Sequence, residues 1–259
     1  MSVETISTTE LSPARGPLKG AAALLEFPIL DREPSRRLPG AGHPVWTYIG
    51  GVLLAWAAIA GLSILVGLFV MHVLLHVHGV AADDESLVRV LAHHRSTTLT
   101  DASLVGSIMA GGVVLPIIAG AAALVALAVK HWRLAGFLLF SLAVESGSYR
   151  ATTLVVHRHR PEVHRLEHLP VNASYPSGHT AASIAIYGGL ALLLTSRLER
   201  RAARIAVWAV AVLIPLFVAF SRMYRGMHHP IDVAGGVLIG VAALSALVVV
   251  TRASGSAAR

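Results

Sequence analysis

A histidine and an aspartate four residues apart are the side chains best suited to chemistry. His228 and Asp232 follow Ser221-Arg222 in the segment SRMYRGMHHPID. On a helix such a pair shares a face, so the carboxylate can hold one ring nitrogen and leave the other as a directed nucleophile. Arg222 adds a planar guanidinium that matches two phosphate oxygens. The alternative is a structural His–Asp contact at a helix end.

A second motif, Pro176-Ser177-Gly178-His179, has the pattern of a helix start. Ser177 is a natural N-cap and Gly178 permits close backbone approach. The free N–H groups of a helix N-terminus attract phosphate, and His179 would then donate a proton to a leaving oxygen. The alternative is an ordinary capped helix with a solvent-facing histidine. The pair Arg160-Pro161 lies further upstream and supplies another guanidinium.

The composition indicates a membrane protein. The 259 residues are 55% hydrophobic and only 14% charged, whereas a soluble domain carries about 25% charged residues. Cysteine is absent, which excludes disulfides and thiolate metal sites. The net charge of +7 arises largely from arginines at the ends of apolar runs. This placement fits lipid headgroups and topology signals, and we expect no nucleic-acid partner.

Long apolar segments predict an all-α bundle of six transmembrane helices. The predicted spans are 46–75, 104–129, 132–156, 178–196, 204–221 and 231–251. Small residues at Ala110-Gly111-Gly112 and Gly235-Gly236 are expected to let helix backbones approach closely. Residues 1–45 are expected to form a largely disordered cytoplasmic tail, or to place the apolar stretch 21–30 in the membrane interface. Residues 252–259 are expected to form a short cytoplasmic tail.

The distribution of Lys and Arg predicts that both termini are cytoplasmic. All three motifs then lie on the extracytoplasmic side, where they can form one site. The segment 81–103 has the pattern of an amphipathic surface helix, and we expect it to flank the site entrance.

These motifs resemble those of the type 2 phosphatidic acid phosphatase superfamily. Pro176-Ser177-Gly178-His179 and Ser221-Arg222-x5-His228-x3-Asp232 match two signatures of that family. Of the third signature, Lys-x6-Arg-Pro, only Arg160-Pro161 matches, because Thr153 occupies the lysine position. The resemblance covers residues 104 to 250. It implies an integral-membrane lipid phosphatase that uses neither metal nor cofactor.

The resemblance also implies a role for each residue. His228 would attack phosphorus to form a phosphohistidine, Asp232 would orient its ring, and His179 would protonate the leaving oxygen and then help water hydrolyse the intermediate. The remaining matched residues would hold the phosphoryl oxygens; they are Arg160, Ser177, Gly178 and Arg222. We expect Arg150 or Arg158 to replace the missing lysine. Glu145 is expected at membrane depth, where ionisable groups are paired or functional.

Two other functions remain open from the sequence. The histidines of the loop before Pro176, together with those next to Pro230, suggest a metal-dependent hydrolase; they are His157, His159, His164, His168, His228 and His229. A membrane transporter or lipid-binding relative would also have several spans. For a phosphatase, the candidate substrates are phosphatidic acid, phosphatidylglycerol phosphate and polyprenyl phosphates or diphosphates of a bacterial plasma membrane. The oligomeric state is not indicated.

Overall fold

The computed structural model of the chain describes residues 44–168 and 173–256, and these residues form helices joined by loops. The expectations for residues 1–43 lie outside this described part. The helices are α2 (Pro44–His72), the 3-10 turn η2 (Leu74–His76), α3 (Val80–His93), α4 (Thr97–Met109), α5 (Val114–Ala128), α6 (Trp132–Val155), α7 (Gly178–Thr195), α8 (Arg201–Tyr224) and α9 (Pro230–Ser256). The prediction of an all-α fold is confirmed.

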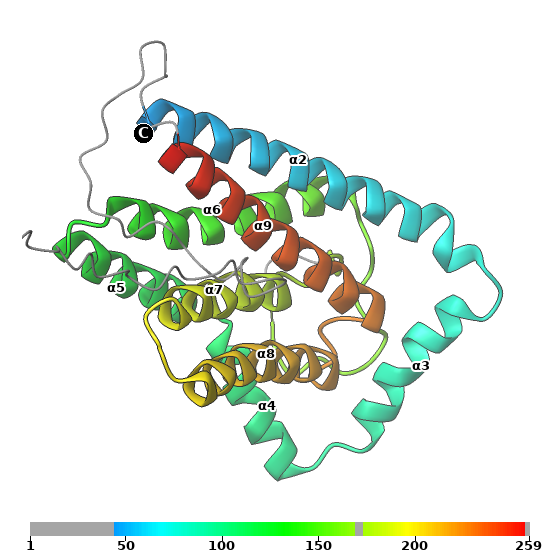
Figure 1. Cartoon of the computed structure of the whole chain (residues 1–259). Coiled ribbons are helices and arrows are strands. Elements are labelled where there is room, and N and C mark those ends of the chain that lie inside the picture. Colours follow the sequence, from blue (N-terminus) through cyan, green and yellow to red (C-terminus); the bar gives the residue numbers. More distant parts are fainter. Residues whose placement is uncertain (1–43, 169–172, 257–259) are drawn as a thin grey trace, which may run out of the picture.

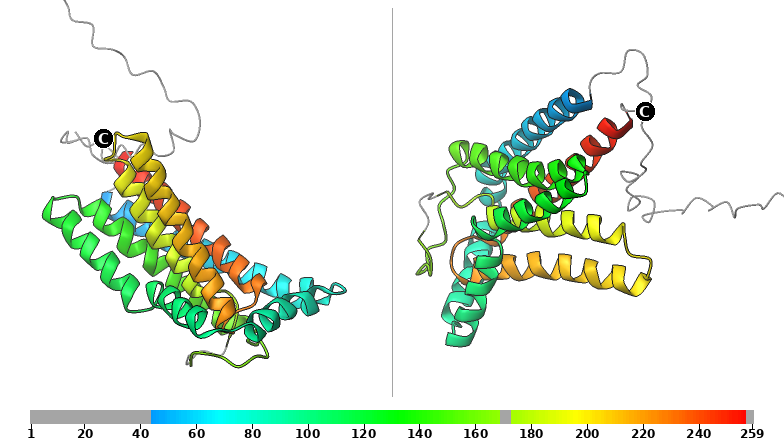
Figure 2. Two further views of the ribbon diagram at one scale, coloured as in Figure 1. Left: turned by 90° about the horizontal axis from the view of Figure 1, so that it is seen from below. Right: turned by 90° about the vertical axis from the view of Figure 1, so that its left-hand side faces the viewer.

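The long helices pack as a bundle, with α3 and α4 at one end of it (Figure 1). Helix α2 lies along α6 and α9, while α7 packs between α8 and α9. The short connection between α7 and α8 makes them an antiparallel pair (Figure 2). The bundle brings the N-termini of α7 and α9 and the C-termini of α6 and α8 to the same end.

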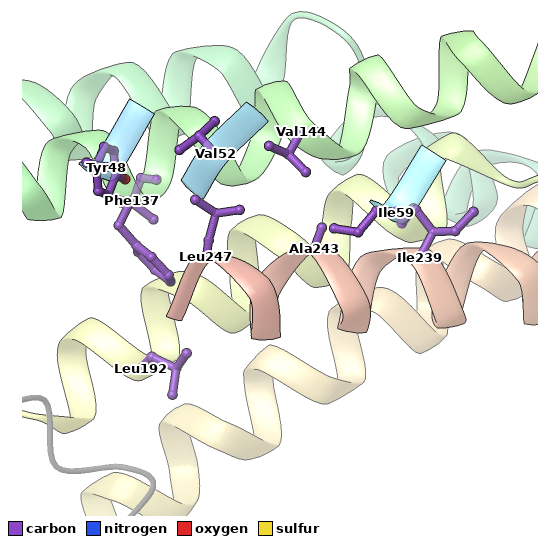
Figure 3. Packing of buried hydrophobic residues seen from close by; sticks show 11 residues of the cluster. Tyr48, Val52, Ile59, Phe137, Val144, Leu192, Ile239, Ala243 and Leu247 are labelled. Carbon is purple, nitrogen blue, oxygen red and sulfur yellow. The ribbon is translucent and has the colours of Figure 1, made fainter. Parts of the chain in front are cut away.

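Apolar side chains from α2, α6, α7 and α9 meet in the main core of the bundle (Figure 3). Phe137 and Leu247 are fully buried there, and Tyr48 stacks edge-on against Phe140. Many apolar side chains of α5 and α8 are exposed instead, among them Leu124 and Leu213. Apolar side chains on the outside of a helix bundle are expected of helices that face lipid.

The prediction of six spans is not confirmed. Four helices are long and apolar enough to cross a membrane, namely α2 with η2, α7, α8 and α9, and the pair α4–α5 makes a fifth if it counts as one bent span. Helix α6 fails this test because it carries Arg133, Glu145 and Arg150. Its polar residues are nevertheless useful to the packing, because Ser141, Glu145, Ser148 and Thr152 form a buried stripe. Thr152 donates a hydrogen bond of 2.6 Å to Ser63 of α2.

The segment predicted as one span at 104–129 is two helices bent by 42°. The bend falls at Ala110-Gly111-Gly112, where the chain leaves helical geometry. A Cβ on Gly112 would meet no atom within 4 Å, so this glycine does not serve close helix packing as predicted. The amphipathic segment 81–103 is likewise divided, because α3 ends at His93 and α4 begins at Thr97.

The second pair of small residues, Gly235-Gly236, does permit close approach. A Cβ on Gly235 would lie 2.4 Å from the ring of Tyr175, and one on Gly236 would lie 2.5 Å from the carbonyl oxygen of Ser177. The first turns of α9 therefore press directly against the segment that begins α7. This contact fixes the two motifs relative to each other.

Replacing Gly236 by alanine should test this contact. The added methyl group would overlap the Ser177 backbone, and overpacking of this kind costs about 1–3 kcal/mol of folding free energy. Gly120→Ala is the matched control, because Gly120 is also helical but has open space around it. In detergent, thermal unfolding should show a lower Tm for Gly236→Ala and an unchanged or higher Tm for Gly120→Ala. Equal Tm values would contradict the contact.

Candidate active site

Two motif histidines share one cavity at the end of the bundle. The cavity has a volume of about 300 Å³, and both His179 and His228 line it together with Gly178. The α4–α5 bend, α5 and α6 also line the cavity, with Leu115, Pro116 and Leu142 among their apolar residues. The cavity therefore combines two histidines with apolar side chains.

Helix α6 adds polar groups to the same cavity. Glu145, Ser146 and Tyr149 line it. The Ser146 hydroxyl donates a 3.0 Å hydrogen bond to one carboxyl oxygen of Glu145, while the other oxygen has no partner among the described residues. The sequence left Glu145 without a partner, and the structure places it beside the two histidines. Residues of helix α3 do not line the cavity, but Asp84 and Glu85 of α3 contact Ile231 and His229, which are close to His228 in the chain. That the segment 81–103 flanks the entrance stays a prediction.

His228 is held by a backbone carbonyl rather than by Asp232. Its Nδ1 lies 2.7 Å from the carbonyl oxygen of Ser174, whereas the nearest Asp232 oxygen is 4.0 Å away. Because a carbonyl oxygen only accepts hydrogen bonds, Nδ1 carries the proton and Nε2 keeps its lone pair. The predicted direct hydrogen bond from the His228 ring to Asp232 is not made, because Nδ1 is bonded to the Ser174 carbonyl instead.

The electrostatic surroundings keep His228 neutral. Burial lowers the pKa of His228 well below its ordinary value, and the positive charges of Arg222 and Arg160 lower this pKa further. At neutral pH the imidazole is therefore uncharged. An uncharged ring with a free Nε2 is the form of histidine that acts as a nucleophile.

Asp232 instead organises the residues around His228. The buried carboxylate accepts a hydrogen bond from the hydroxyl of Ser174 and another, of 2.8 Å, from the backbone N–H of His229. It also forms an ion pair with Arg158 at 2.5 Å. Ser174 in turn offers the carbonyl that orients His228. Asp232 thus acts on the His228 ring through Ser174.

Helix α3 reaches this network through two acidic residues. Asp84 pairs with Arg158 and accepts a 2.9 Å hydrogen bond from the backbone N–H of Ile231. Glu85 accepts from Nε2 of His229 at 2.9 Å. Asp84, Glu85 and Ser174 were not predicted as site residues from the sequence. The only signal was an acidic cluster in the segment 81–103, which gave no indication of its partners.

The helix start at Ser177 occurs as predicted, but without the side-chain cap. Ser177 occupies the N-cap position of α7, and its hydroxyl lies 2.9 Å from the hydroxyl of Thr180 instead of bonding a free N–H. The free N–H groups of α7 are thus left available. A Cβ on Gly178 would lie 3.1 Å from the ring of Tyr149, so this glycine permits Tyr149 to cover the helix start.

The arginines lie close to the histidines but do not line the cavity. Arg160 donates to the carbonyl of Met227, next to His228. Arg222 is fully buried, and its Nη1 donates to Ser107 and, at 2.7 Å, to Glu167. Burial alone would raise the pKa of Glu167, but the positive charges of Arg222 and Arg225 outweigh it and lower this pKa to about 2.

The two candidates for the missing lysine differ in their surroundings. Arg158 is buried and committed to Asp84 and Asp232. Arg150 is exposed on α6, one residue after Tyr149 of the cavity wall, and has no ion pair within residues 44–168 and 173–256. Thr153, at the lysine position, donates to the carbonyl of Arg150 at 2.9 Å. Arg150 is therefore the cation left available for a ligand.

The loop histidines do not come together as the metal hypothesis requires. All four histidines of the loop before Pro176 are exposed, namely His157, His159, His164 and His168. In the part of the chain that the structure describes, no three His, Cys, Asp or Glu side chains form a group that could hold a metal ion.

Comparison with known proteins supports the family resemblance. Residues 134–255 match the family model of the PAP2 superfamily. This region, a little under half of the chain, is similar to a PAP2 superfamily domain. It contains Arg160, the motif of His179 and the motif of His228 and Asp232.

Individual relatives match shorter segments. The chain is 40% identical over 75 residues to an undecaprenyl-diphosphatase of Sulfolobus acidocaldarius, which covers 29% of this chain and 32% of that protein. It is 37% identical over 68 residues to the lipid phosphate phosphatase delta of Arabidopsis thaliana, covering 26% of this chain and 16% of that one. The chain thus matches a third or less of the length of these relatives.

A solved structure shows the same fold over most of the chain. It is the crystal structure of a transmembrane PAP2-type phosphatidylglycerolphosphate phosphatase from Bacillus subtilis, with a TM-score of 0.60 and 22% identity. The match covers 79% of this chain and 94% of that chain. At this identity, the likeness shows the helix arrangement rather than the reaction.

The stability of arginine variants should distinguish the two candidate cations. Arg158→Ala would leave two buried carboxylates without their cation, and breaking such a pair costs about 3–5 kcal/mol. Arg150→Ala removes an exposed side chain and should change the folding free energy by less than about 0.5 kcal/mol. Thermal unfolding in detergent should show a large fall in Tm for Arg158→Ala alone. Similar Tm values for both variants would contradict the assigned contacts.

Proposed function

We propose that this protein is a metal-independent membrane phosphatase that hydrolyses lipid phosphates or polyprenyl diphosphates through a phosphohistidine on His228. The observation that carries the proposal is the shared cavity of His179 and His228. In it His228 is neutral, its Nδ1 proton is held by Ser174, and its Nε2 is left to react. The PAP2 superfamily match supports the same chemistry.

The proposed reaction has two steps. In the first, Nε2 of His228 attacks phosphorus, the bond from phosphorus to the leaving oxygen breaks, and His179 gives its proton to that oxygen. In the second, His179 accepts a proton from water, whose oxygen attacks phosphorus and breaks the nitrogen–phosphorus bond. Inorganic phosphate leaves and His228 is neutral again. Arg160, Arg222 and the N–H groups at Gly178 stabilise the negative charge on the phosphoryl oxygens.

The cavity wall supports a lipid substrate. Its apolar residues come from the α4–α5 bend, α5, α6 and α7, and α7 is long and apolar enough to cross a membrane. A lipid can therefore keep its tail in hydrocarbon while its phosphate reaches the histidines. The Lys and Arg distribution supports an extracytoplasmic site with both termini in the cytoplasm. Relatives named as an undecaprenyl-diphosphatase and a lipid phosphate phosphatase support the same substrate classes.

Trapping the covalent intermediate tests the proposal. Purified protein should release phosphate from a panel of phosphatidic acid, phosphatidylglycerol phosphate and polyprenyl diphosphate in detergent micelles. Rapid quenching with a ³²P-labelled substrate should leave acid-labile, alkali-stable label on the protein, as expected of phosphohistidine. His228→Ala should lose both turnover and label. A His228→Ala variant with wild-type turnover would exclude His228 as the nucleophile.

The same phosphate-release assay distinguishes the proposed phosphatase from a metal-dependent hydrolase and from a transporter or lipid-binding protein. Loss of turnover in EDTA, restored by zinc, would establish a metal-dependent hydrolase instead. A pure wild-type protein that folds but releases no phosphate from any substrate of the panel would favour a transporter or lipid-binding relative. For the Arg150→Ala variant described next, Arg150→Lys serves as a conservative control, because lysine retains the positive charge at this position.

A second variant pair tests the replacement of the family lysine. We propose that Arg150 supplies the cation missing at Thr153, because it is exposed next to the cavity wall and unpaired among the described residues. Arg150→Ala should raise KM roughly ten-fold, the effect of losing one charged hydrogen bond. Adding Thr153→Lys to Arg150→Ala should restore much of this loss. An unchanged KM in Arg150→Ala would refute the replacement.

A further inference from the structure

Glu167 is an acidic loop residue that contacts Arg222, an arginine of a family motif. It lies in the loop between α6 and α7, twelve residues before His179 in the sequence. Its two carboxyl oxygens divide between two arginines, with Oε2 2.7 Å from Nη1 of Arg222 and Oε1 paired to Nε of Arg225. None of the motifs accounts for this residue.

The contacts of Arg222 are concentrated on a single nitrogen. Nη1 donates both to Glu167 and to the hydroxyl of Ser107 in α4. Nε and Nη2 of the same guanidinium are buried and have no partner among the described residues. A buried donor without a partner is costly, and these two nitrogens form the edge of arginine that binds two oxygens of one phosphoryl group.

We propose that Glu167 is a positioning residue, which together with Ser107 holds the Nη1 side of Arg222 so that its Nε–Nη2 edge is presented to the phosphoryl group of the substrate. This inference rests on the proposed function and adds a residue outside the family motifs. Glu167 does not touch the substrate. It acts by restricting the rotation of Arg222 before the substrate binds, which reduces the entropy lost on binding.

The surroundings of Glu167 favour a fixed support over a side chain that gives way to phosphate. Arg225 anchors its second oxygen, and Arg225 is itself bound to α4 through the carbonyl of Thr100 and, at 3.1 Å, the hydroxyl of Ser103. Arg225 also donates to the carbonyl of Leu166, the neighbour of Glu167. The carboxylate is thus tied to a helix and not only to Arg222.

Affinity for inorganic phosphate tests the inference without relying on turnover. The dissociation constant would be measured for the purified protein by ³¹P NMR titration, beside KM and kcat for the lipid substrate. Glu167→Ala should weaken phosphate binding and raise KM roughly ten-fold. Glu167→Gln keeps one acceptor oxygen and should fall between wild type and Glu167→Ala. Glu162→Ala is the matched control, since Glu162 lies in the same loop but its side chain is 84% exposed.

A double-mutant cycle adds a readout that a purely structural role would not produce. Ser107→Ala removes the other acceptor of Nη1 and should weaken phosphate binding in the same direction. Because both residues act on one nitrogen, the double variant should lose less than the product of the two single effects. Fully multiplicative losses would overturn the shared role.

Whether Glu167→Ala binds phosphate more weakly or more tightly decides whether Glu167 positions Arg222 or competes with the substrate for it. Tighter or unchanged phosphate binding in Glu167→Ala would overturn the inference, and tighter binding would identify Glu167 as a competitor of the substrate. If Glu167→Ala fails to fold, Glu167→Gln decides by the same criterion. A wild-type protein that neither binds phosphate nor releases it from lipids would reject the proposed function, whereas an active wild type with an unaffected Glu167→Ala would reject only the role of Glu167.

Discussion

The arrangement of the site depends on one buried carboxylate. Asp232, at the start of α9, accepts hydrogen bonds from Ser174 and His229 and pairs with Arg158, which is paired to Asp84 of α3. A buried charge without partners is strongly unfavourable. The loop before α7, helix α3 and the start of α9 must therefore come together around it. Because Ser174 also orients His228, the same requirement that stabilises the fold fixes the ring that we propose as the nucleophile.

The arginines around the histidines are of two kinds, those paired with carboxylates and those that retain unpaired groups. Arg158 is committed to the carboxylates of Asp84 and Asp232, and Arg225 to Glu167 and to α4, so both act as supports. Arg222 retains an unpartnered edge among the described residues, and Arg150 remains exposed beside the cavity wall. A preorganised site needs both kinds, since groups that bind charge in a transition state contribute most when they need not reorganise. Together with burial, the positive charges of Arg222 and Arg160 lower the pKa of His228 and so keep its ring neutral.

Long apolar helices provide the frame of the bundle. Helices α2, α7, α8 and α9 are apolar enough to span a bilayer, while α6 carries its polar stripe inward, where Thr152 meets Ser63 of α2. The bend between α4 and α5 opens the bundle at the cavity. A solved transmembrane PAP2-type structure with a TM-score of 0.60 shares this frame. In this protein, the apolar lining of the cavity beside its two histidines fits the proposed substrate, a molecule that remains partly in the bilayer.

The helical class, most helix positions and the two histidine motifs could be predicted from the sequence, because hydrophobic periodicity and local capping act over a few residues. The sequence also predicted that these motifs meet, since each follows or precedes an apolar run. It did not determine the bend at Gly111, the inward polar stripe of α6, or the contact partners of Asp232 and Arg222. Those depend on side chains distant in the chain, such as Asp84 and Glu167. Only tertiary packing decides which buried charges share a space, because pairing is set by distance and burial, which spacing along the chain does not specify.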